Sequence, residues 1–455
     1  MPDAPPIVPA ANPYLRGNFA PVADELTAFD LPVTGALPPG LTGTYLRNGP
    51  NPLAPPDDHH WFTGAGMLHG VRLEDGHARW YRSRFVRTER LAAARPDLAA
   101  AGGAPEPSGR STGSNTAVLA HHGGVFALSE PATLPHRIGP ELASLGRDDF
   151  GGALTRLGMN AHPRIDPATG ELFALGYGGR PWLRLHHLDA AGQLVAAIDI
   201  DLPTPTIVHD LAITARHVLI FDLPLHLDLP RAMRGVPYPI VWRPEAGGRI
   251  GVLPRTATDA SAIQWVPCPP RFVYHAANAF DDGDAIVVDV VTHASQGLRD
   301  RVGPFDGPTP LERWRVEPLA GRTTTVVVDE RHTEFPTIDP RRVGRPYRRA
   351  YGVALHDVGG PDFRYGGLRG YDLATGAVVT HDEGPGVHFD EGVFVPAHPQ
   401  AAEDEGHVLA FAWDRARDRS ELVVLDASDL AGPAIARVAL PTRVPHGFHG
   451  AWIPR

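Results

Sequence analysis

Three features of the sequence predict an all-β protein of the β-propeller class. The 455 residues include 49 Gly and 48 Pro, which favour turns and interrupt helices. Apolar and polar residues alternate in runs that are broken by short Asp/Gly turns, as in β-hairpins. These runs recur along the whole chain. Radial repetition of small antiparallel sheets is the usual way to bury that many hairpins without long exposed edges.

The hairpin pattern occurs in six segments: 71–87, 163–175, 183–200, 314–330, 368–382 and 422–440. Their spacing is irregular, so it does not give the number of blades. Segments 88–103 and 225–242 have a different pattern and are expected to be cap insertions beside the sheets. No linker of low complexity divides the chain, so residues 1–455 are predicted to form one domain.

Composition excludes several classes of function. A net charge of −10 argues against nucleic acid as a partner. All 42 basic residues are arginine, which removes phosphate-binding, Schiff-base and general-base lysines. Cys268 is the single cysteine, so a disulfide within the chain and a cysteine-rich metal site are impossible. With no secretory leader or membrane-spanning segment evident, we expect a cytoplasmic protein.

Four of the 23 histidines lie near predicted strands among small, proline or apolar residues: His162, His209, His275 and His449. They are too far apart in the sequence for one helix or hairpin to supply two of them. A closed radial scaffold could bring them to one point, where an all-imidazole site suits Fe, Cu, Zn or Ni. The alternative is that each is a hydrogen-bonded core histidine.

Metal-binding imidazoles usually have their other ring nitrogen held, often by a carboxylate. Glu130, Glu334 and Glu391 occupy apolar or proline-rich contexts, where an unpaired carboxylate is costly to bury. These glutamates are therefore candidates to hold the imidazoles. The alternative is a glutamate at a strand end that faces water.

Several motifs follow one another along the chain: NPYLRGNFAPV (12–22), LPPGLTGTYLRNGPNP (37–52), HHWFTGAGMLHGVRL (59–73), NAHPRID (160–166), VHDLAITARHVLIFDLPL (208–225), EFPTIDP (334–340), EGVFVP (391–396) and GFHGAW (447–452). In this order they resemble the carotenoid cleavage oxygenases nearly from end to end. Thr63 and Ala65 stand where that family commonly has Asp, and Gly392 stands where Pro is usual.

The resemblance implies a seven-bladed β-propeller with a small helical cap over the metal-centre face. It also implies a non-haem Fe(II) on the propeller axis, bound at the positions of His162, His209, His275 and His449. By the family pattern Glu130 would hold His209, Glu334 would hold His275 and Glu391 would hold His449. His162 would then have no carboxylate partner.

The implied activity is O₂-dependent cleavage of a C=C bond in a conjugated polyene, a carotenoid or apocarotenoid, to two carbonyl products. A stilbene-cleaving branch of the family binds the substrate phenol with a lysine just before the first glutamate. Ser129 stands there, which favours a polyene and leaves stilbene cleavage as the alternative. The sequence also leaves open an isomerase that uses the same iron as a Lewis acid, and a metal-free propeller that serves as a binding scaffold.

Apolar residues in 225–242 suggest peripheral contact with a membrane for substrate uptake, although a buried cap segment gives the same pattern. No partner protein is implied.

Overall fold

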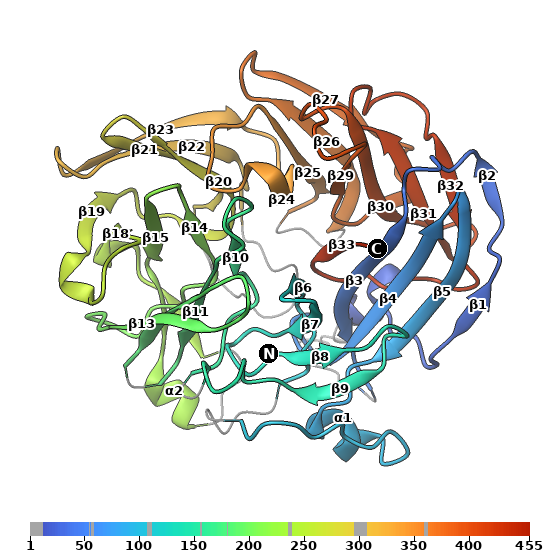
Figure 1. Cartoon of the computed structure of the whole chain (residues 1–455), viewed down its shortest axis with the longest axis horizontal. Helices are drawn as coiled ribbons and strands as arrows, with labels where there is room; N and C mark the ends of the chain where they lie inside the picture. The colour runs from blue at the N-terminus through green and yellow to red at the C-terminus, as the bar shows by residue number, and fades with distance from the viewer. Residues whose placement is uncertain are drawn as a thin grey trace, which may run out of the picture.

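Seven antiparallel sheets surround a central axis in the computed structural model, as Figure 1 shows. The structure describes residues 12–53, 55, 59–106, 112–154, 157–179, 181–234, 239–294, 307–358 and 363–455. Each of the seven sheets has four or more strands, and an eighth is a two-stranded ribbon. The predicted all-β, seven-bladed propeller is therefore confirmed.

Five blades are four-stranded. The first three contain β6 (Ala117–His121), β7 (Gly124–Leu128), β8 (His136–Ile138) and β9 (Ser144–Arg147); β10 (Arg164–Ile165), β11 (Leu172–Tyr177), β12 (Leu183–Leu188) and β13 (Leu194–Ile200); and β14 (Leu211–Ile213), β15 (His217–Asp222), β18 (Gly248–Pro254) and β19 (Gln264–Cys268). The next two contain β20 (Phe272–Asp282), β21 (Ala285–His293), β22 (Leu311–Glu317) and β23 (Arg322–Asp329); and β24 (Thr333–Ile338), β25 (Arg349–His356), β26 (Arg364–Asp372) and β27 (Ala377–His381).

The remaining two blades combine strands from both ends of the chain. One contains β1 (Thr27–Phe29), β5 (His77–Phe85), β4 (Ala65–Glu74), β3 (Gly43–Asn51) and β33 (Gly450–Pro454). The other contains β2 (Val33–Gly35), β32 (Ala436–Ala439), β31 (Arg419–Asp426), β30 (Gly406–Asp414), β28 (Val387–Phe389) and β29 (Val393–Pro396). Because β33 pairs with β3 and β2 pairs with β32, backbone hydrogen bonds close the ring.

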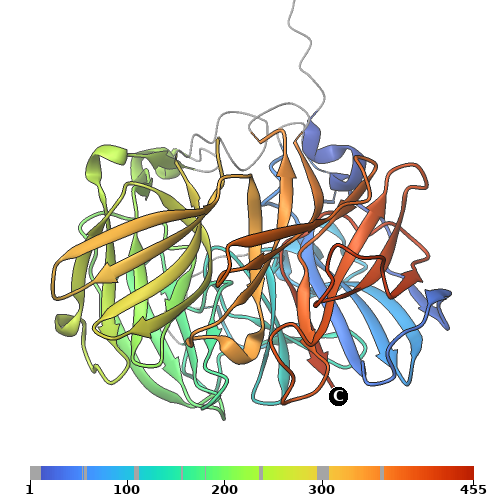
Figure 2. The ribbon, with the colours of Figure 1, turned by 90° about the horizontal axis from the view of Figure 1, so that it is seen from above.

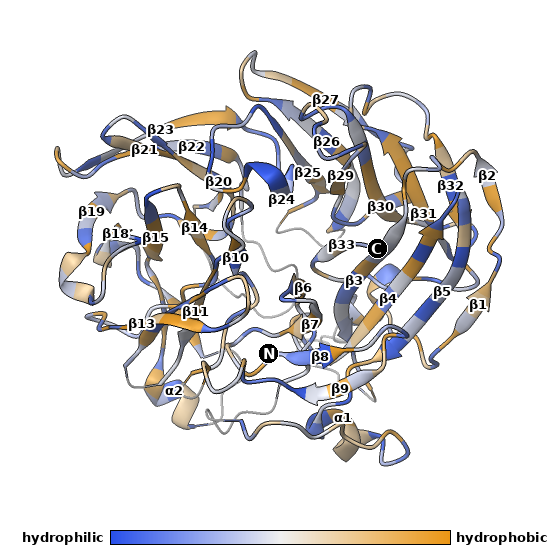
Figure 3. Ribbon diagram, in the orientation of Figure 1, coloured by the Kyte–Doolittle hydropathy of each residue, from blue (hydrophilic) through white to orange (hydrophobic). Residues whose placement is uncertain are grey.

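All six predicted hairpins are antiparallel pairs of strands: β4/β5, β10/β11, β12/β13, β22/β23, β26/β27 and β31/β32. Burial follows position in the blade. Every residue of β21 is buried, which explains its mostly apolar sequence, whereas the outer strand β23 is mostly exposed. Figure 3 shows such apolar stretches along strands of the blades, for example β4 and β31. The core therefore lies between the sheets.

Helices contribute little. The described α-helices are α1 (Glu89–Ala94) and α2 (Leu229–Met233), accompanied by short 3-10 turns at Pro13–Leu15, Gly17–Phe19, Pro244–Ala246, Ala260–Ala262 and Pro340–Arg342. Figure 2 shows α2 and the turns of residues 13–19 on the face opposite the C-terminus. None of the described helices has the length and hydropathy needed to span a bilayer.

The two predicted insertions differ in structure. Segment 88–103 contains α1. Thr88 caps the N-terminus of this helix, because its side chain accepts a hydrogen bond from the Leu91 N–H. Segment 225–242 contains α2 and the ribbon formed by β16 (Leu225–Leu227) and β17 (Ile240–Trp242). Residues 235–238 of that segment lie outside the described residues. That residues 1–455 form a single domain stays a prediction.

Candidate metal centre

The four candidate histidines come from the inner edges of four different blades. His162 and His209 each lie two residues before the first strand of a blade, β10 and β14. His275 lies within β20, and His449 immediately precedes β33. The innermost strand of each of these blades runs beside the axis (Figure 1), so the ring brings together side chains that are far apart in the sequence.

These imidazoles meet in one place. Nitrogen atoms of His162, His209 and His275 all lie within 4.8 Å of one another. The ring centroid of His449 lies 4.7 Å from that of His162 and 4.8 Å from that of His275. The structure therefore places all four candidates in a single cluster.

The nitrogens at the centre of this cluster fit a metal ion. The Nε2 atoms of His162 and His275 are buried and have no hydrogen-bond partner among the described residues. Leaving buried polar atoms unpaired is costly, and a metal ion would supply the missing interaction. An all-imidazole donor set without thiolates suits a first-row transition metal.

Burial also keeps two of these imidazoles in the form that binds metals. It lowers the pKa of His162 well below its usual value, and the neighbouring His209, His449 and His275 lower it further. The pKa of His209 is likewise well below its usual value, first because of burial and then because of the other imidazoles. Both rings are therefore neutral at pH 7, with a lone pair available.

Glu334 lies beside His275. The Nδ1–H of His275 donates to Glu334 Oε2 at 2.5 Å, which directs its Nε2 toward the other imidazoles. Burial lowers the pKa of His275, but the carboxylates around it, Glu334 first and then Asp210 and Glu391, together raise the pKa overall. Phe335 N–H donates to the same oxygen at 2.7 Å. Glu334 is fully buried, and in this low-dielectric surrounding its charge interacts strongly with the His275 imidazole.

Glu391 makes a similar contact with His449. The Nδ1–H of His449 donates to Glu391 Oε1 at 2.9 Å, and the Gly450 N–H donates to Oε2 at 2.7 Å. Glu391 lies between β28 and β29, next to the ion pair of Asp390 Oδ2 with Arg47 Nη1 at 2.8 Å. The last ligand candidate is therefore tied to a neighbouring blade.

The contact between Glu130 and His209 is looser. Glu130 Oε2 and His209 Nδ1 are 4.0 Å apart, beyond hydrogen-bond distance. The Glu130 side chain is 17% exposed, whereas that of Glu334 is fully buried. No carboxylate contacts His162 within the described part of the chain. This arrangement matches the pairing that the family resemblance implies, with one contact weaker than the other two.

Residues adjacent to three of the histidines form a brace that the sequence interpretation missed. Arg164 Nη2 lies 2.5 Å from Asp210 Oδ2 and donates to the Ala276 carbonyl at 2.7 Å. The same Asp210 oxygen accepts from the Ala276 N–H at 2.8 Å. These residues follow His162, His209 and His275 by two, one and one positions, and they tie the three segments together. An Arg or Asp one or two residues after a histidine carries no distinctive signal in the sequence.

Aromatic rings cover part of the cluster. Phe335 packs against His275 and His449, with centroids 5.4 Å from each. Tyr274 packs against His209 at 5.1 Å. Phe335 has a positive φ of 53°, a strained backbone conformation for a bulky residue. The strained residue is the one whose aromatic ring packs against two candidate ligands.

A cavity of about 670 Å³ also reaches the cluster. Its lining includes His162, His275 and His449, together with Trp452 and Pro454 of β33. Figure 2 shows the C-terminus on one face of the propeller, so the cavity lies on the C-terminal side. Phe335 and Tyr274 do not line it. The cluster thus adjoins a cavity on one side and an aromatic surface on another.

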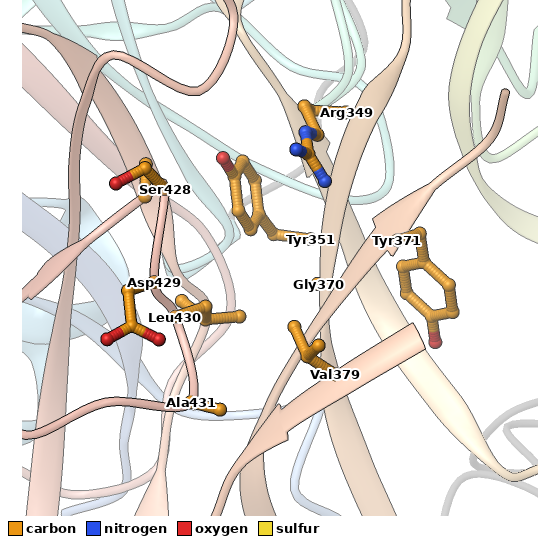
Figure 4. Close-up of a pocket in the computed structure, with 10 residues that line it drawn as sticks. Arg349, Tyr351, Gly370, Tyr371, Val379, Ser428, Asp429, Leu430 and Ala431 are labelled. Atoms are coloured by element: carbon orange, nitrogen blue, oxygen red, sulfur yellow. The ribbon is translucent and has the colours of Figure 1, made fainter. Parts of the chain in front are cut away.

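A second cavity, of about 100 Å³, lies away from this cluster. Figure 4 shows its lining, which includes Tyr351 of β25, Tyr371 of β26 and the loop 427–431 after β31. The pocket lies between two blades and contains none of the predicted site residues.

Comparisons with known proteins agree with this geometry. The family model described as retinal pigment epithelial membrane protein (RPE65) matches residues 19–454. A carotenoid cleavage oxygenase of Mycobacterium tuberculosis is 37% identical over 493 aligned residues, which cover 97% of this chain and 98% of the relative.

Solved structures give the same picture. The crystal structure of a Pseudomonas brassicacearum lignostilbene dioxygenase has a TM-score of 0.88 at 30% identity and covers 97% of this chain and 98% of that one. Cobalt-substituted Synechocystis apocarotenoid oxygenase (ACO) has a TM-score of 0.86 at 29% identity and covers 96% and 97%. The cobalt indicates that this kind of protein has a non-haem metal centre. The chain therefore belongs to the RPE65 and carotenoid cleavage oxygenase family.

Proposed function

We propose that the protein is a non-haem Fe(II) dioxygenase that cleaves a C=C bond of a carotenoid or apocarotenoid with O₂. The observation that carries this proposal is the meeting of four imidazoles, two of them with buried, unpaired Nε2 atoms among the described residues, in a chain whose curated relatives are oxygenases. His162, His209, His275 and His449 would hold the metal. When bound there, Fe(II) supplies the activation of O₂, and the two products are carbonyl compounds.

The residues around the metal ligands orient them. Glu334 and Glu391 each accept from the Nδ1–H of one imidazole, which fixes the ring and leaves its Nε2 for the metal. The brace of Arg164, Asp210 and Ala276 fixes the backbone next to three ligands. The chain thus holds the four nitrogens in place before the metal arrives, which lowers the cost of binding it.

The aromatic surface beside the cluster favours an apolar conjugated substrate. Phe62 extends the surface of Phe335 and Tyr274, since its centroid lies 6.2 Å from Tyr274 and 5.8 Å from Phe448. Such rings pack against a polyene and exclude water from it. The role proposed for this surface is to position one double bond at the metal.

Stilbene cleavage is the second candidate, because the lignostilbene dioxygenase resembles this chain as closely as the apocarotenoid oxygenase does. Ser129, at the position of the phenol-binding lysine, does not favour it. The Ser129 side chain is 2% exposed, and its hydroxyl lies 2.7 Å from Thr112 Oγ1 and 3.2 Å from the Pro131 carbonyl. A hydroxyl engaged in this way offers little to a substrate phenol.

The exposed side chains of α2 support peripheral contact with a membrane. Leu229 is 46% exposed and Met233 is 89% exposed. Apolar side chains on a surface helix can enter the membrane interface, where polyenes dissolve. Replacing both with Ser is expected to reduce co-sedimentation with lipid vesicles, and unchanged co-sedimentation would contradict this part of the proposal. The cytoplasmic location stays a prediction.

The proposal is tested by incubating Fe(II)-loaded protein with apocarotenals and with hydroxystilbenes under ¹⁸O₂. We expect apocarotenals to give two carbonyl products that carry ¹⁸O. Labelled aldehydes from the stilbenes alone would favour the second candidate. Isomerised but uncleaved polyene would indicate an isomerase, and an iron-loaded protein that turns over neither substrate would contradict the proposed activity.

A further inference from the structure

A fifth histidine, His293, lies behind the candidate metal centre. It ends β21, is 1% exposed, and has Nε2 at 2.8 Å from Glu334 Oε1. Glu334 Oε2, on the other side of the same carboxylate, accepts from His275 Nδ1–H. One buried carboxylate is thus shared between a candidate metal ligand and a histidine from the adjoining strand.

The Glu334 carboxylate is the acceptor of these contacts. Its Oε2 also accepts from the Phe335 N–H at 2.7 Å. With the carboxylate oxygens as acceptors, both imidazoles donate an N–H to them. Glu334 has no exposure to solvent, and each of its oxygens has a histidine donor.

The other two glutamates are held differently. The second oxygen of Glu391 accepts from a backbone N–H, that of Gly450, which no side-chain substitution removes. Glu130 is partly exposed and lies 4.0 Å from its imidazole. Glu334 Oε2 also accepts from a backbone N–H, that of Phe335. Its other oxygen, in contrast, is held by a second histidine side chain, which a single substitution can remove.

We propose that His293 is a positioning residue of the metal centre: its Nε2–H orients the Glu334 carboxylate, which in turn holds His275 with Nε2 toward the metal. This inference rests on the proposed function, because it requires that the four histidines bind the metal. His293 also packs edge-on against Tyr274, with ring centroids 5.1 Å apart, and Tyr274 in turn contacts His209. The proposed effect of His293 on the metal passes through Glu334.

The test measures Fe(II) affinity by anaerobic competition with a chromogenic chelator. His293→Leu removes the N–H donor and is expected to weaken binding 10- to 100-fold, the range typical of residues that orient a ligand. His293→Gln restores an N–H donor and should bind iron within about 3-fold of the unmodified protein. His186→Leu is the matched control, because His186 is equally buried but lies within β12, in a different blade from His293 and Glu334. The control should leave iron affinity unchanged.

A double-substitution cycle separates positioning from packing. In a Glu334→Gln background, His293→Leu should cause no further loss of affinity, because its effect passes through the carboxylate. If His293→Leu alone does not fold, the comparison of Glu334→Gln with the double variant still tests the proposal. The glutamine carries no charge that loss of His293 could leave unpaired. Three results would each overturn the proposal. They are a further loss of iron affinity when His293→Leu is added to Glu334→Gln, unchanged affinity in His293→Leu alone, and a His293→Gln variant that binds iron as weakly as His293→Leu. Absence of iron binding in the unmodified protein would instead refute the proposed function.

Discussion

The two sides of the metal centre are built differently. His275 and Glu334 lie within strands of two different blades, β20 and β24, and approach to 2.5 Å, with the Glu334 side chain fully buried. His209 and Glu130 lie in loops, before β14 and after β7, and remain 4.0 Å apart with Glu130 partly exposed. The same pair of residue types thus forms a strong charge-assisted hydrogen bond on one side and a weak interaction on the other.

This difference teaches that a ligand and its carboxylate are held most firmly where strands position both. Strands in a packed sheet fix the direction of each side chain, whereas loops leave more freedom. We therefore expect the strand-built side to control metal affinity and the loop-built side to tolerate substitution.

The largest expected effect is that of removing a ligand from the strand-built side. His275→Ala should weaken Fe(II) binding by more than about 100-fold, because loss of a ligand exceeds the effect of losing a group that orients one. Metal content after desalting, measured by elemental analysis, checks this. His77→Ala, at the exposed first residue of β5, should retain iron, and equal iron content in both variants would remove His275 from the site.

The next effect compares the two glutamates directly. Glu334→Gln should weaken Fe(II) binding 10- to 100-fold, because the imidazole loses an ionised acceptor. Glu130→Gln should change affinity less than about 3-fold, because its carboxylate lies 4.0 Å from His209, too far for a hydrogen bond. Chelator competition on the two proteins measures both values. An equal or larger loss for Glu130→Gln would reverse the comparison.

A smaller effect is expected from pH in the metal-free protein. The pKa of His162 and His209 is lowered by burial, and that of His60 and His186 is lowered to about 4. Such groups stabilise the fold above pH 6.5, and this contribution is lost as pH falls toward their folded pKa, by about 1.4 kcal/mol per histidine and pH unit.

His275 acts in the opposite direction, because its pKa is raised: its contribution is complete below pH 6.5 and is lost as pH rises through the folded value. The groups with lowered pKa outnumber it, so the melting temperature measured by calorimetry should fall between pH 7 and pH 5. A melting temperature that rises over this interval would contradict the burial argument.

Much of the fold could be predicted from the sequence, because alternation and Asp/Gly turns are local signals. All six hairpins follow from such patterns, whereas the blade number required the family resemblance. The closure of the ring by β33 and β3 joins strands some 400 residues apart, and no local pattern encodes such a pairing.

The candidate site, too, could be predicted only in part from the sequence. Its histidines and glutamates could be singled out by context and by the family motifs, but their supports could not. His293 ends a buried apolar strand and gives no sign that it faces a carboxylate on another blade. Arg164 and Asp210 look like ordinary surface charges, and only the folded ring shows that they join the segments of three ligands.

The central claim is that one iron ion binds among the four imidazoles. Anomalous diffraction at the iron absorption edge from crystals of the Fe(II)-loaded protein tests it most directly. We predict one anomalous peak per chain, surrounded by the Nε2 atoms of His162, His209, His275 and His449. A fully loaded crystal with its iron peak elsewhere, or with the four imidazoles turned away from it, would contradict the account.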